Sequence, residues 1–393
     1  MNINKPSMIV LGSTGSVGEQ AIDVAERFGV DVDAISAHKN VKRVEAQARA
    51  YKVKACAMSD PFAAKDLAER LADTDIKVYS GTEGICEMVA ETNSKGDNGQ
   101  VVENSIVGEA GLMPTLATLR AGKRLALANK ESLVVGGEIV MKAAKDSGHE
   151  ILPVDSEHCA IFQCLRSGKK SEIKNIILTA SGGPFFGYTK EQLKGATLES
   201  ALAHPTWSMG SKITVDSATL MNKGFEVIEA VHLFGVKPDQ VKVVVHRESI
   251  VHSAIEYIDN SVIAQMSAPD MRHCVQYALT HPERGEATTE ALDLFSVGKL
   301  TFQKPDTDTF VLLNKAFEAI RLGGAVPAIL NAANEEAVAA FLEKKIGFMD
   351  ICEIVCAVTD SLEDRKSVHD LDGILACARQ ARELACEHIC RRR

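Results

Sequence analysis

A glycine-rich turn at residues 12–18 has the pattern of a dinucleotide phosphate site. The turn reads Gly-Ser-Thr-Gly-Ser-Val-Gly, follows the apolar run 8–11 and precedes a helical pattern over 17–28. Glycines let the backbone approach a pyrophosphate, and the start of a helix offers free N–H groups and the positive end of a dipole. Thr14 and Ser16 add hydroxyl donors. We expect a dinucleotide site here. The alternative is a glycine turn that serves only close packing of strand and helix.

The residues after the second expected strand favour NADPH over NADH. That strand covers 30–35 and runs into Ser-Ala-His-Lys-Asn at 36–40, with Arg43 one turn further on. An NAD enzyme usually has Asp or Glu at this point to hold the ribose 2′-hydroxyl. Here Lys39 and Arg43 could meet a 2′-phosphate instead. The alternative for Lys39 is a solvated loop cation.

Two carboxylates follow another apolar strand, at 150–154. Asp155 and Glu157 come directly after it, His158 is the only imidazole close by, and no cysteine is adjacent to the pair. Ligands collect at the carboxyl ends of parallel strands, and oxygen donors suit Mg²⁺ or Mn²⁺. Glu226, at an expected helix start, is the best candidate for a third ligand. The alternative is a pair of acids that favours the first turn of a helix.

A second group of polar residues could hold a phosphate monoester. The strand 176–179 leads into Ser-Gly-Gly at 181–183, which can form a compact anion-binding nest. Ser217, Asn222 and Lys223 lie on another polar segment. Hydroxyls and an amide would fix the geometry, and the lysine would supply a point charge. The alternative is a serine-rich helix cap beside a surface lysine.

The only tryptophan, Trp207, lies in the weakly periodic stretch 204–210, with Gly195 and Gly210 on either side as hinges. A tryptophan in such a loop is either a hydrophobic anchor or the apolar face of a lid that keeps water from the reacting centre. Hydride transfer needs that exclusion of water.

The order of elements predicts an α/β protein. Strands separated by helices in the first third indicate right-handed crossovers and a parallel sheet covered on both faces. These strands are expected at 8–11, 30–35, 54–58, 77–79, 105–107, 124–128 and 150–154, with helices at 17–28, 41–51, 61–71 and 112–121. Later strands at 176–179, 241–246, 249–257 and 262–266 have little helix between the last three, and a hairpin turn at 259–260 joins the final pair. Helical patterns then cover 310–322, 328–344, 351–362 and 371–390.

We therefore expect an N-terminal Rossmann-like, doubly wound parallel sheet, an α+β catalytic domain and a C-terminal helical bundle. The expected NADPH-binding domain covers 1–155, and a catalytic domain for metal and substrate covers 156–280, with a lid loop at about 200–211. A linker at 281–306 leads to the helical domain at 307–393. The polar stretch 92–99 is expected to be a surface loop.

Composition narrows the class of protein. The 393 residues carry a net charge of −9, which excludes a generally basic nucleic-acid binder. No apolar run reaches membrane-spanning length, and the polar start of the chain does not resemble a signal peptide. The ten cysteines contain no Cys-x-x-Cys pair, so reduced thiols in a cytoplasmic protein are expected rather than a disulfide framework or a zinc site.

Taken together, the motifs resemble the 1-deoxy-D-xylulose 5-phosphate reductoisomerase family. They occur in unbroken order at 12–18, 128–133, 152–158, 181–185, 204–210, 215–224 and 331–335. The resemblance implies rearrangement of 1-deoxy-D-xylulose 5-phosphate, by retro-aldol cleavage and re-addition, to an aldehyde. NADPH then reduces this aldehyde to 2-C-methyl-D-erythritol 4-phosphate, in the non-mevalonate route to isoprenoids. It also implies a homodimer that binds this small sugar phosphate, with no nucleic-acid or membrane partner.

The family's site residues carry over to matching positions. A divalent cation (Mg²⁺, Mn²⁺ or Co²⁺) is expected on Asp155, Glu157 and Glu226. Substrate contacts are expected from Lys130, Ser156, Glu157, Ser181, His204, Ser217, Asn222, Lys223 and Glu226, together with Trp207 of the lid. Cofactor contacts are expected from Gly12, Thr14, Gly15, Ser16, Val17, His38, Lys39, Asn40, Asn129, Glu131 and Gly210.

In the chemistry itself, Lys130 would stabilise oxyanion charge and Glu157 would relay protons as well as bind the metal, beside Asp155 and Glu226. One departure concerns the cofactor: the family usually has glycine where this chain has His38. The imidazole could stack on adenine or face the 2′-phosphate.

Two other functions stay open on residues alone. One is another NADPH-dependent aldehyde or sugar dehydrogenase, which would need no carboxylate trio, and the other is a non-catalytic NADPH sensor.

Overall fold

The computed structural model describes residues 6–93, 99–207 and 209–392. The chain separates into two compact units, each built from segments that are distant in the sequence. Unit 1 comprises Met1–Ser132, Val140–Cys159 and Asp270–Glu290, and unit 2 comprises Leu133–Ile139, Ala160–Pro269 and Ala291–Arg393. The chain therefore passes from one unit to the other five times. The division into four consecutive domains stays a prediction.

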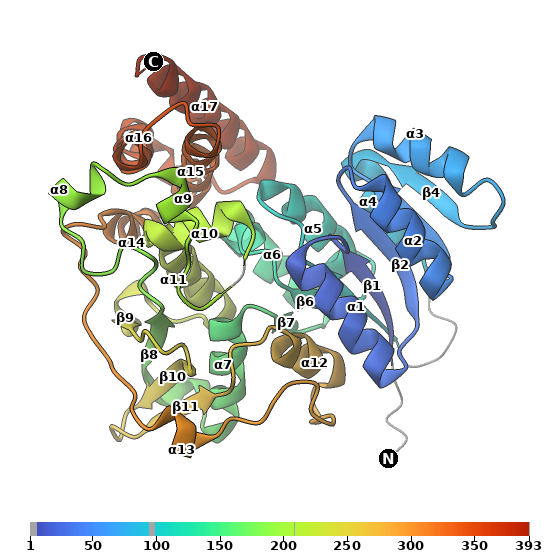
Figure 1. Cartoon of the computed structure of the whole chain (residues 1–393), viewed down its shortest axis with the longest axis horizontal. Coiled ribbons are helices and arrows are strands. Elements are labelled where there is room, and N and C mark those ends of the chain that lie inside the picture. The colour runs from blue at the N-terminus through green and yellow to red at the C-terminus, as the bar shows by residue number, and fades with distance from the viewer. Residues whose placement is uncertain (1–5, 94–98, 208, 393) are drawn as a thin grey trace. The chain divides into compact units, whose positions relative to one another are not determined.

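Unit 1 is built on a seven-stranded parallel sheet (Figure 1). Its strands lie in the order β4-β3-β2-β1-β5-β6-β7, and every adjacent pair is parallel. The central strands are buried along their whole length, as expected for a sheet covered on both faces. This confirms the Rossmann-like prediction. The strands are β1 (Ser7–Leu11), β2 (Val32–Ala37), β3 (Ala55–Met58), β4 (Lys77–Ser80), β5 (Gln100–Asn104), β6 (Arg124–Leu127) and β7 (Ile151–Pro153).

Helices connect these strands, and one helix comes from much later in the chain. The connecting helices are α1 (Ser16–Phe28), α2 (Val41–Tyr51), α3 (Pro61–Arg70), α4 (Gly81–Glu91), α5 (Leu112–Arg120) and the two ends of α6 (Glu131–Ser147). The late helix is α12 (Arg272–Thr280), which packs against α1. Arg272 Nη1 lies 3.3 Å from Asp23 Oδ2, and Arg27 donates to the Thr288 carbonyl oxygen at 3.4 Å. The segment after residue 270 is thus part of unit 1.

One strand was placed wrongly by the sequence pattern. A strand was expected at 105–107, but β5 covers Gln100–Asn104. Beyond it, Ile106 N–H bonds to the Asn104 side-chain oxygen at 3.2 Å, so the chain turns out of the sheet. The polar residues that flank Val101 and Val102 hid the strand. Helix α4 was also not expected, and residues 94–98 of the expected surface loop lie outside the described residues.

Glu103 on β5 is a fully buried carboxyl group. Its Oε2 lies 3.1 Å from Ser105 Oγ, and its Oε1 has no hydrogen-bond partner among the residues that the structure describes. Burial raises the pKa of Glu103 to about 8, whereas the hydrogen bond to Ser105 lowers it by less. Glu103 is therefore largely protonated in the folded protein at neutral pH.

This raised pKa predicts a pH dependence of stability. The unfolded chain releases the Glu103 proton near the ordinary pKa of 4.5, but the folded chain keeps it up to about 8. The contribution of Glu103 to stability is complete below pH 4.5 and is lost as the pH rises to about 8. Replacing Glu103→Gln keeps the shape and removes the titration, so the melting temperature of the variant should fall less over this range. Parallel melting curves of variant and parent against pH would contradict the assignment.

Unit 2 contains a four-stranded mixed sheet in the order β11-β10-β8-β9. Strands β8 (Ile173–Ala180) and β9 (Val241–Val245) are parallel, and β10 (Val251–Tyr257) is antiparallel to both β8 and β11 (Val262–Met266). Asn260, in the turn between the last two strands, has the left-handed φ of 66° that asparagine tolerates. The predicted hairpin and mixed sheet are confirmed.

The rest of unit 2 is mainly helical. Helix α15 is the centre of the C-terminal bundle, because α14, α16 and α17 all pack against it. The expected linker contains only the short helix α13 (Leu294–Val297) and one bridge, between Val245 and Gln303. Among the described residues, no helix has the length and apolar character needed to cross a membrane. The other helices are the last part of α7 (Ser156–Cys164), which begins in unit 1, together with α8 (Lys190–Leu193), α9 (Leu198–Ala201), α10 (Ser211–Ala218), α11 (Met221–Phe234), α14 (Leu312–Leu322), α15 (Val326–Leu342), α16 (Phe348–Ser361) and α17 (Leu371–Cys390).

Candidate functional site

The glycine turn of unit 1 leads directly from β1 into α1. Gly12 has a φ of 87°, and a β-carbon there would lie 2.8 Å from the Ser105 carbonyl oxygen, so only glycine fits. Gly15 is the N-cap of α1 and provides no side-chain cap for the helix N–H groups. Gly15 and Ser16 are exposed, and Thr14 and Val17 are half-buried. The turn thus presents the positive end of a helix dipole at the carboxyl edge of the sheet.

The end of β2 carries the residues expected to select NADPH. Lys39 is exposed and its Nζ lies 3.5 Å from Asp60 Oδ2, in the loop after β3. His38 is also exposed, and its Nδ1 lies 2.8 Å from Ser59 Oγ. Asn40 is the N-cap of α2, and its side chain accepts a hydrogen bond from the Arg43 N–H. No acidic residue stands on the tip of β2 itself.

At the end of β6, polar residues form a buried network. Asn129 donates to the carbonyl oxygens of Ile106 and Gly108 at 2.6 and 2.9 Å, and to Glu131 Oε2 at 3.0 Å. Its side-chain oxygen accepts a hydrogen bond from the Ser132 N–H at 2.8 Å. Asn129 therefore fixes the loop from which Lys130 and Glu131 project. All three residues lie on the same edge of the sheet as the glycine turn, because the strands are parallel.

The end of β7 carries the first two expected metal ligands. Asp155 is buried and forms an ion pair with Lys130, and its Oδ1 also accepts a hydrogen bond from the Glu157 N–H at 3.2 Å. His158 Nδ1 lies 3.5 Å from Asp155 Oδ1. Ser156 donates to Glu157 Oε2 at 2.5 Å at the start of α7. Both carboxylates thus stand at the carboxyl edge of the sheet, where the sequence predicted them.

In unit 2, the Ser-Gly-Gly turn follows β8. Gly182 and Gly183 have φ values of 79° and 69°, a conformation that side chains disfavour. A β-carbon on Gly183 would lie 2.6 Å from the Ser217 carbonyl oxygen, so the turn touches the end of α10. Arg247 donates to the carbonyl oxygens of Ser181 and Gly183 at 3.0 and 2.7 Å. These bonds occupy the carbonyl groups of the turn, and the Gly183 N–H donates to Ser181 Oγ at 3.3 Å.

His204 is tied to the same turn. Its Nδ1 accepts hydrogen bonds from the backbone N–H groups of Thr206 and Trp207 at 3.3 and 3.0 Å. Nε2, 2.9 Å from Ser181 Oγ, must therefore carry the proton and donate to the serine. Burial, and then the charge of Arg247, lower the pKa of His204 to about 4. The imidazole is neutral at physiological pH.

Trp207 and Gly210, the residues of the expected lid, follow His204 in the chain. The Trp207 ring is half-buried, with its centroid 6.3 Å from that of His252, and Gly210 is the exposed N-cap of α10. Ser208 lies outside the described residues. Both interpretations of Trp207, anchor and lid, therefore stay open.

The third expected metal ligand is in unit 2, on α11. Glu226 is almost fully buried, and it lies inside the helix rather than at the expected helix start. Its Oε2 forms an ion pair with Lys223, and its Oε1 accepts a hydrogen bond from Asn222 at 2.6 Å. Ser217 is buried near the end of α10. Three of the expected phosphate-binding residues, Ser217, Asn222 and Lys223, thus share two consecutive helices, α10 and α11, with Glu226.

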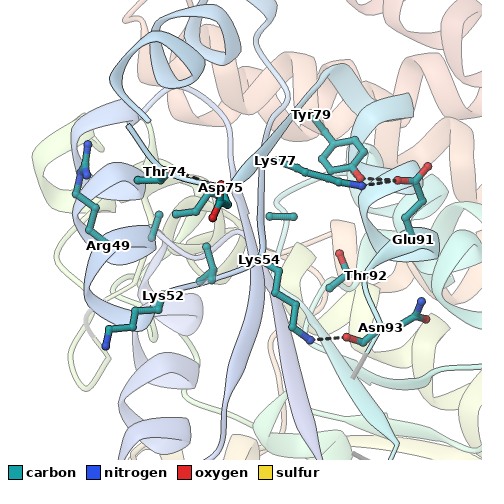
Figure 2. Close-up of a pocket in the computed structure, with 14 residues that line it drawn as sticks. Arg49, Lys52, Lys54, Thr74, Asp75, Lys77, Tyr79, Glu91, Thr92 and Asn93 are labelled. Atoms are coloured by element: carbon teal, nitrogen blue, oxygen red, sulfur yellow. Dashed lines mark hydrogen bonds and ion pairs between the residues drawn. The ribbon is translucent and has the colours of Figure 1, made fainter. Parts of the chain in front are cut away.

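Unit 1 contains a cavity of about 700 Å³ (Figure 2). Most of the residues that line it precede β3 and β4, at the amino edge of the sheet. Two of its cations have carboxylate partners: Arg49 Nη2 lies 2.8 Å from Asp73 Oδ1, and Lys54 Nζ lies 2.7 Å from Asp33 Oδ1. None of the predicted site residues lines this cavity, so we do not assign the site to it.

Sequence reasoning missed the residues that hold the expected ones in place. Asp60 and Ser59 contact Lys39 and His38 from the neighbouring strand, and Arg247 shapes the Ser-Gly-Gly turn. The position of Asp60 at the end of an apolar strand was a usable signal. No sequence signal marked Arg247, because its contact with the Ser-Gly-Gly turn depends on how β8 and β9 pair.

A parallel sheet with a glycine turn at its carboxyl edge defines a dinucleotide-binding domain, and the polar edge beside it indicates an enzyme. Three family models match the chain. The model of 1-deoxy-D-xylulose 5-phosphate reductoisomerase matches residues 8–137, and two models of its C-terminal domain match 151–234 and 266–384. The chain belongs to the 1-deoxy-D-xylulose 5-phosphate reductoisomerase family, which confirms the resemblance found in the motifs.

Named relatives extend over nearly the whole chain. The enzyme of Acetivibrio thermocellus is 50% identical over 97% of this chain and 98% of its own length. That of Caldanaerobacter subterraneus subsp. tengcongensis is 46% identical, with coverages of 96% and 97%. A solved reductoisomerase in complex with NADPH, fosmidomycin and magnesium is 39% identical, with a TM-score of 0.92 and 98% of each chain covered. The Zymomonas mobilis enzyme in complex with NADPH is 40% identical, with a TM-score of 0.89 over 98% of this chain and 99% of its own.

Proposed function

We propose that this chain converts 1-deoxy-D-xylulose 5-phosphate to 2-C-methyl-D-erythritol 4-phosphate, with NADPH as reductant and a divalent cation as second cofactor. The observation that carries the proposal is 50% identity to the Acetivibrio enzyme over 97% of the chain. Solved relatives that contain NADPH and magnesium support the same cofactors here. Nothing in the comparisons supports another dehydrogenase or a non-catalytic NADPH sensor.

The glycine turn and the end of β2 would hold NADPH. The uncapped start of α1, with Gly15 and Ser16 exposed, fits a pyrophosphate. Lys39 provides a positive charge where a 2′-phosphate needs one, and no carboxylate on the tip of β2 competes for a 2′-hydroxyl. When bound, NADPH supplies the hydride. Asn129, Glu131 and Gly210 complete the cofactor contacts that we propose.

The metal proposal depends on three carboxylates, Asp155, Glu157 and Glu226. Their oxygens are the donors that Mg²⁺ and Mn²⁺ prefer. Two of them are buried, and each of these two is paired with an ammonium group, Lys130 on Asp155 and Lys223 on Glu226. Both buried carboxylates are therefore already in an environment that favours a positively charged partner. When bound, a divalent cation supplies Lewis-acid polarisation of the substrate carbonyl.

The chain's own groups would orient the substrate and balance its charge. We propose that Ser181, Ser217, Asn222 and Lys223 bind the phosphate. Neutral His204, a further substrate contact, orients Ser181 by donating from Nε2 to its Oγ. Lys130 would stabilise negative charge on the substrate oxygens, Glu157 would relay protons, and Ser156 would hold the carboxylate of Glu157. Trp207 would exclude water. A cytoplasmic location fits ten cysteines that form no disulfide among the described residues.

The direct test follows NADPH absorbance with the purified chain and 1-deoxy-D-xylulose 5-phosphate, with and without added Mg²⁺. We expect oxidation only when the sugar phosphate and the metal are both present, and loss of activity with EDTA. Activity that survives EDTA would contradict the metal proposal. No oxidation under any of these conditions would contradict the function.

The carboxylate variants sharpen this test. Asp155→Asn and Glu226→Gln should each lower metal-dependent turnover on the order of a hundredfold or more, because a ligand-bound cation is worth several kcal/mol in the transition state. NADPH should still bind, as measured by its fluorescence. Glu256→Gln, at a carboxylate on β10 that is paired with Lys174 and lies outside the predicted site, is the matched control and should keep turnover and metal dependence. Near-normal turnover in either ligand variant would make the assignment wrong.

Lys223 is the expected point charge for the substrate phosphate. Lys223→Ala should raise the KM for the sugar phosphate about tenfold to a hundredfold, the usual range for a hydrogen bond to a charged group. The KM for NADPH should change little. Lys223→Arg keeps the charge and should recover part of the loss. An unchanged KM for the sugar phosphate would remove Lys223 from the phosphate site.

We also propose a homodimer that forms through the sheet of unit 2. Strand β11 is an edge strand, and its side chains Val262 and Ile263 are 53% and 38% exposed. Phe295 and Phe302, in the segment after residue 290, are 99% and 53% exposed. An unprotected edge with exposed apolar side chains favours pairing with another chain, and a second copy fits the family.

Sedimentation equilibrium tests the dimer. We expect about twice the chain mass of 42.3 kDa for the parent protein. Ile263→Glu places a charge on the edge strand and should shift the mass towards one chain without loss of secondary structure. A parent protein that stays monomeric at high concentration would contradict the dimer. A variant that stays dimeric would show that the dimer contact does not include Ile263.

A further inference from the structure

The ends of β2 and β3 form one continuous polar shelf at the carboxyl edge of the unit 1 sheet. Ser59 N–H bonds to the Ala37 carbonyl oxygen at 3.0 Å, and Asp60 N–H bonds to the His38 carbonyl oxygen at 3.3 Å. Two side-chain contacts join the same loops, His38 Nδ1 to Ser59 Oγ and Lys39 Nζ to Asp60 Oδ2. Four interactions therefore hold the two strand ends together.

Phe62 follows this shelf by two residues in the chain, and 87% of its surface is exposed. It lies in the first turn of α3, whose start is fixed by Pro61 and by Asp60, which accepts a hydrogen bond from the Ala63 N–H at 2.9 Å. This N–H is the main cause that lowers the pKa of Asp60. The backbone under the ring is thus well defined, although the ring itself is not packed into the core.

A single exposed aromatic residue is ordinary on a protein surface, so the position of Phe62 must carry the argument. The glycine turn follows β1, and Lys39 stands at the tip of β2. A dinucleotide that reaches from one to the other places its adenosine ribose at the end of β2. The next strand outward is β3, because the sheet order is β4-β3-β2-β1. The base attached to that ribose is therefore directed towards the shelf and Phe62.

Chemistry points the same way. Every nucleobase has a flat π-face, and an aromatic side chain offers a matching surface. Ser59 holds the His38 imidazole through Nδ1, next to Lys39 in the chain. We propose that Phe62 is the platform on which the adenine ring of the cofactor stacks, with the His38 imidazole bordering the ribose. This inference rests on the proposed function, because it assigns the adenine end of its cofactor.

The test uses two fragments of the cofactor, adenosine 2′,5′-bisphosphate and 5′-AMP, titrated calorimetrically into the full-length protein. Phe62→Ala should weaken both about tenfold, because both contain the base. Phe62→Leu keeps apolar bulk but not the aromatic face and should resemble the alanine variant, and Phe62→Trp should restore binding. Lys39→Ala should weaken only the bisphosphate. In turnover, Phe62→Ala should raise the KM for NADPH with kcat and the KM for the sugar phosphate nearly unchanged.

The outcomes separate this inference from the function. If Phe62→Ala binds both fragments as tightly as the parent while NADPH oxidation persists, the adenine platform is wrong and the function stands. If Phe62→Leu binds like the parent, apolar contact rather than stacking holds the base, and the platform is again wrong. If the parent chain binds neither fragment and oxidises no NADPH, both proposals fail. Melting temperatures of the variants close to that of the parent exclude misfolding as the cause of weaker binding.

Discussion

A carboxylate removed from water needs a positive charge beside it, and this requirement shapes the candidate site. Asp155 and Glu226 are both buried, and each is paired with a lysine, Lys130 or Lys223. Breaking such a buried pair leaves an uncompensated charge, which is strongly destabilising. The same four side chains are those that we assign to the cation and the substrate. The groups proposed for chemistry are therefore also groups on which the fold depends.

Parallel pairing in unit 1 then determines where chemistry can be placed. The carboxyl ends of β1, β2, β6 and β7 meet at one edge, so segments far apart in the sequence present their polar residues together. At that edge, the Asn129 side chain donates hydrogen bonds to backbone carbonyl oxygens and so fixes the loop that carries Lys130. The opposite edge holds a cavity that none of the predicted site residues lines. Position on the sheet therefore distinguishes the two edges.

The sequence alone predicted the motifs that fold locally, and it failed where a contact joins distant segments. The glycine turn, the carboxylates after β7 and the β10–β11 hairpin each depend on neighbouring residues, and their elements are as expected. Strand β5 was misplaced because polar residues flank its two valines, and tertiary pairing overrode that pattern. The partners of Lys39 and Ser181, which are Asp60 and His204, come from other elements. No spacing rule reveals such partners, because strand pairing and loop paths bring them together.

The late helix α12 has a consequence for how the protein is made. It covers α1, yet it follows the whole sheet of unit 2 in the chain. During synthesis, the N-terminal half emerges from the ribosome before α12, so the surface of α1 against which α12 packs stays uncovered until then. A truncated chain that stops before Asp270 would lack α12 and the ion pair between Arg272 and Asp23. Unit 1 is therefore complete only after the sheet of unit 2 has been made.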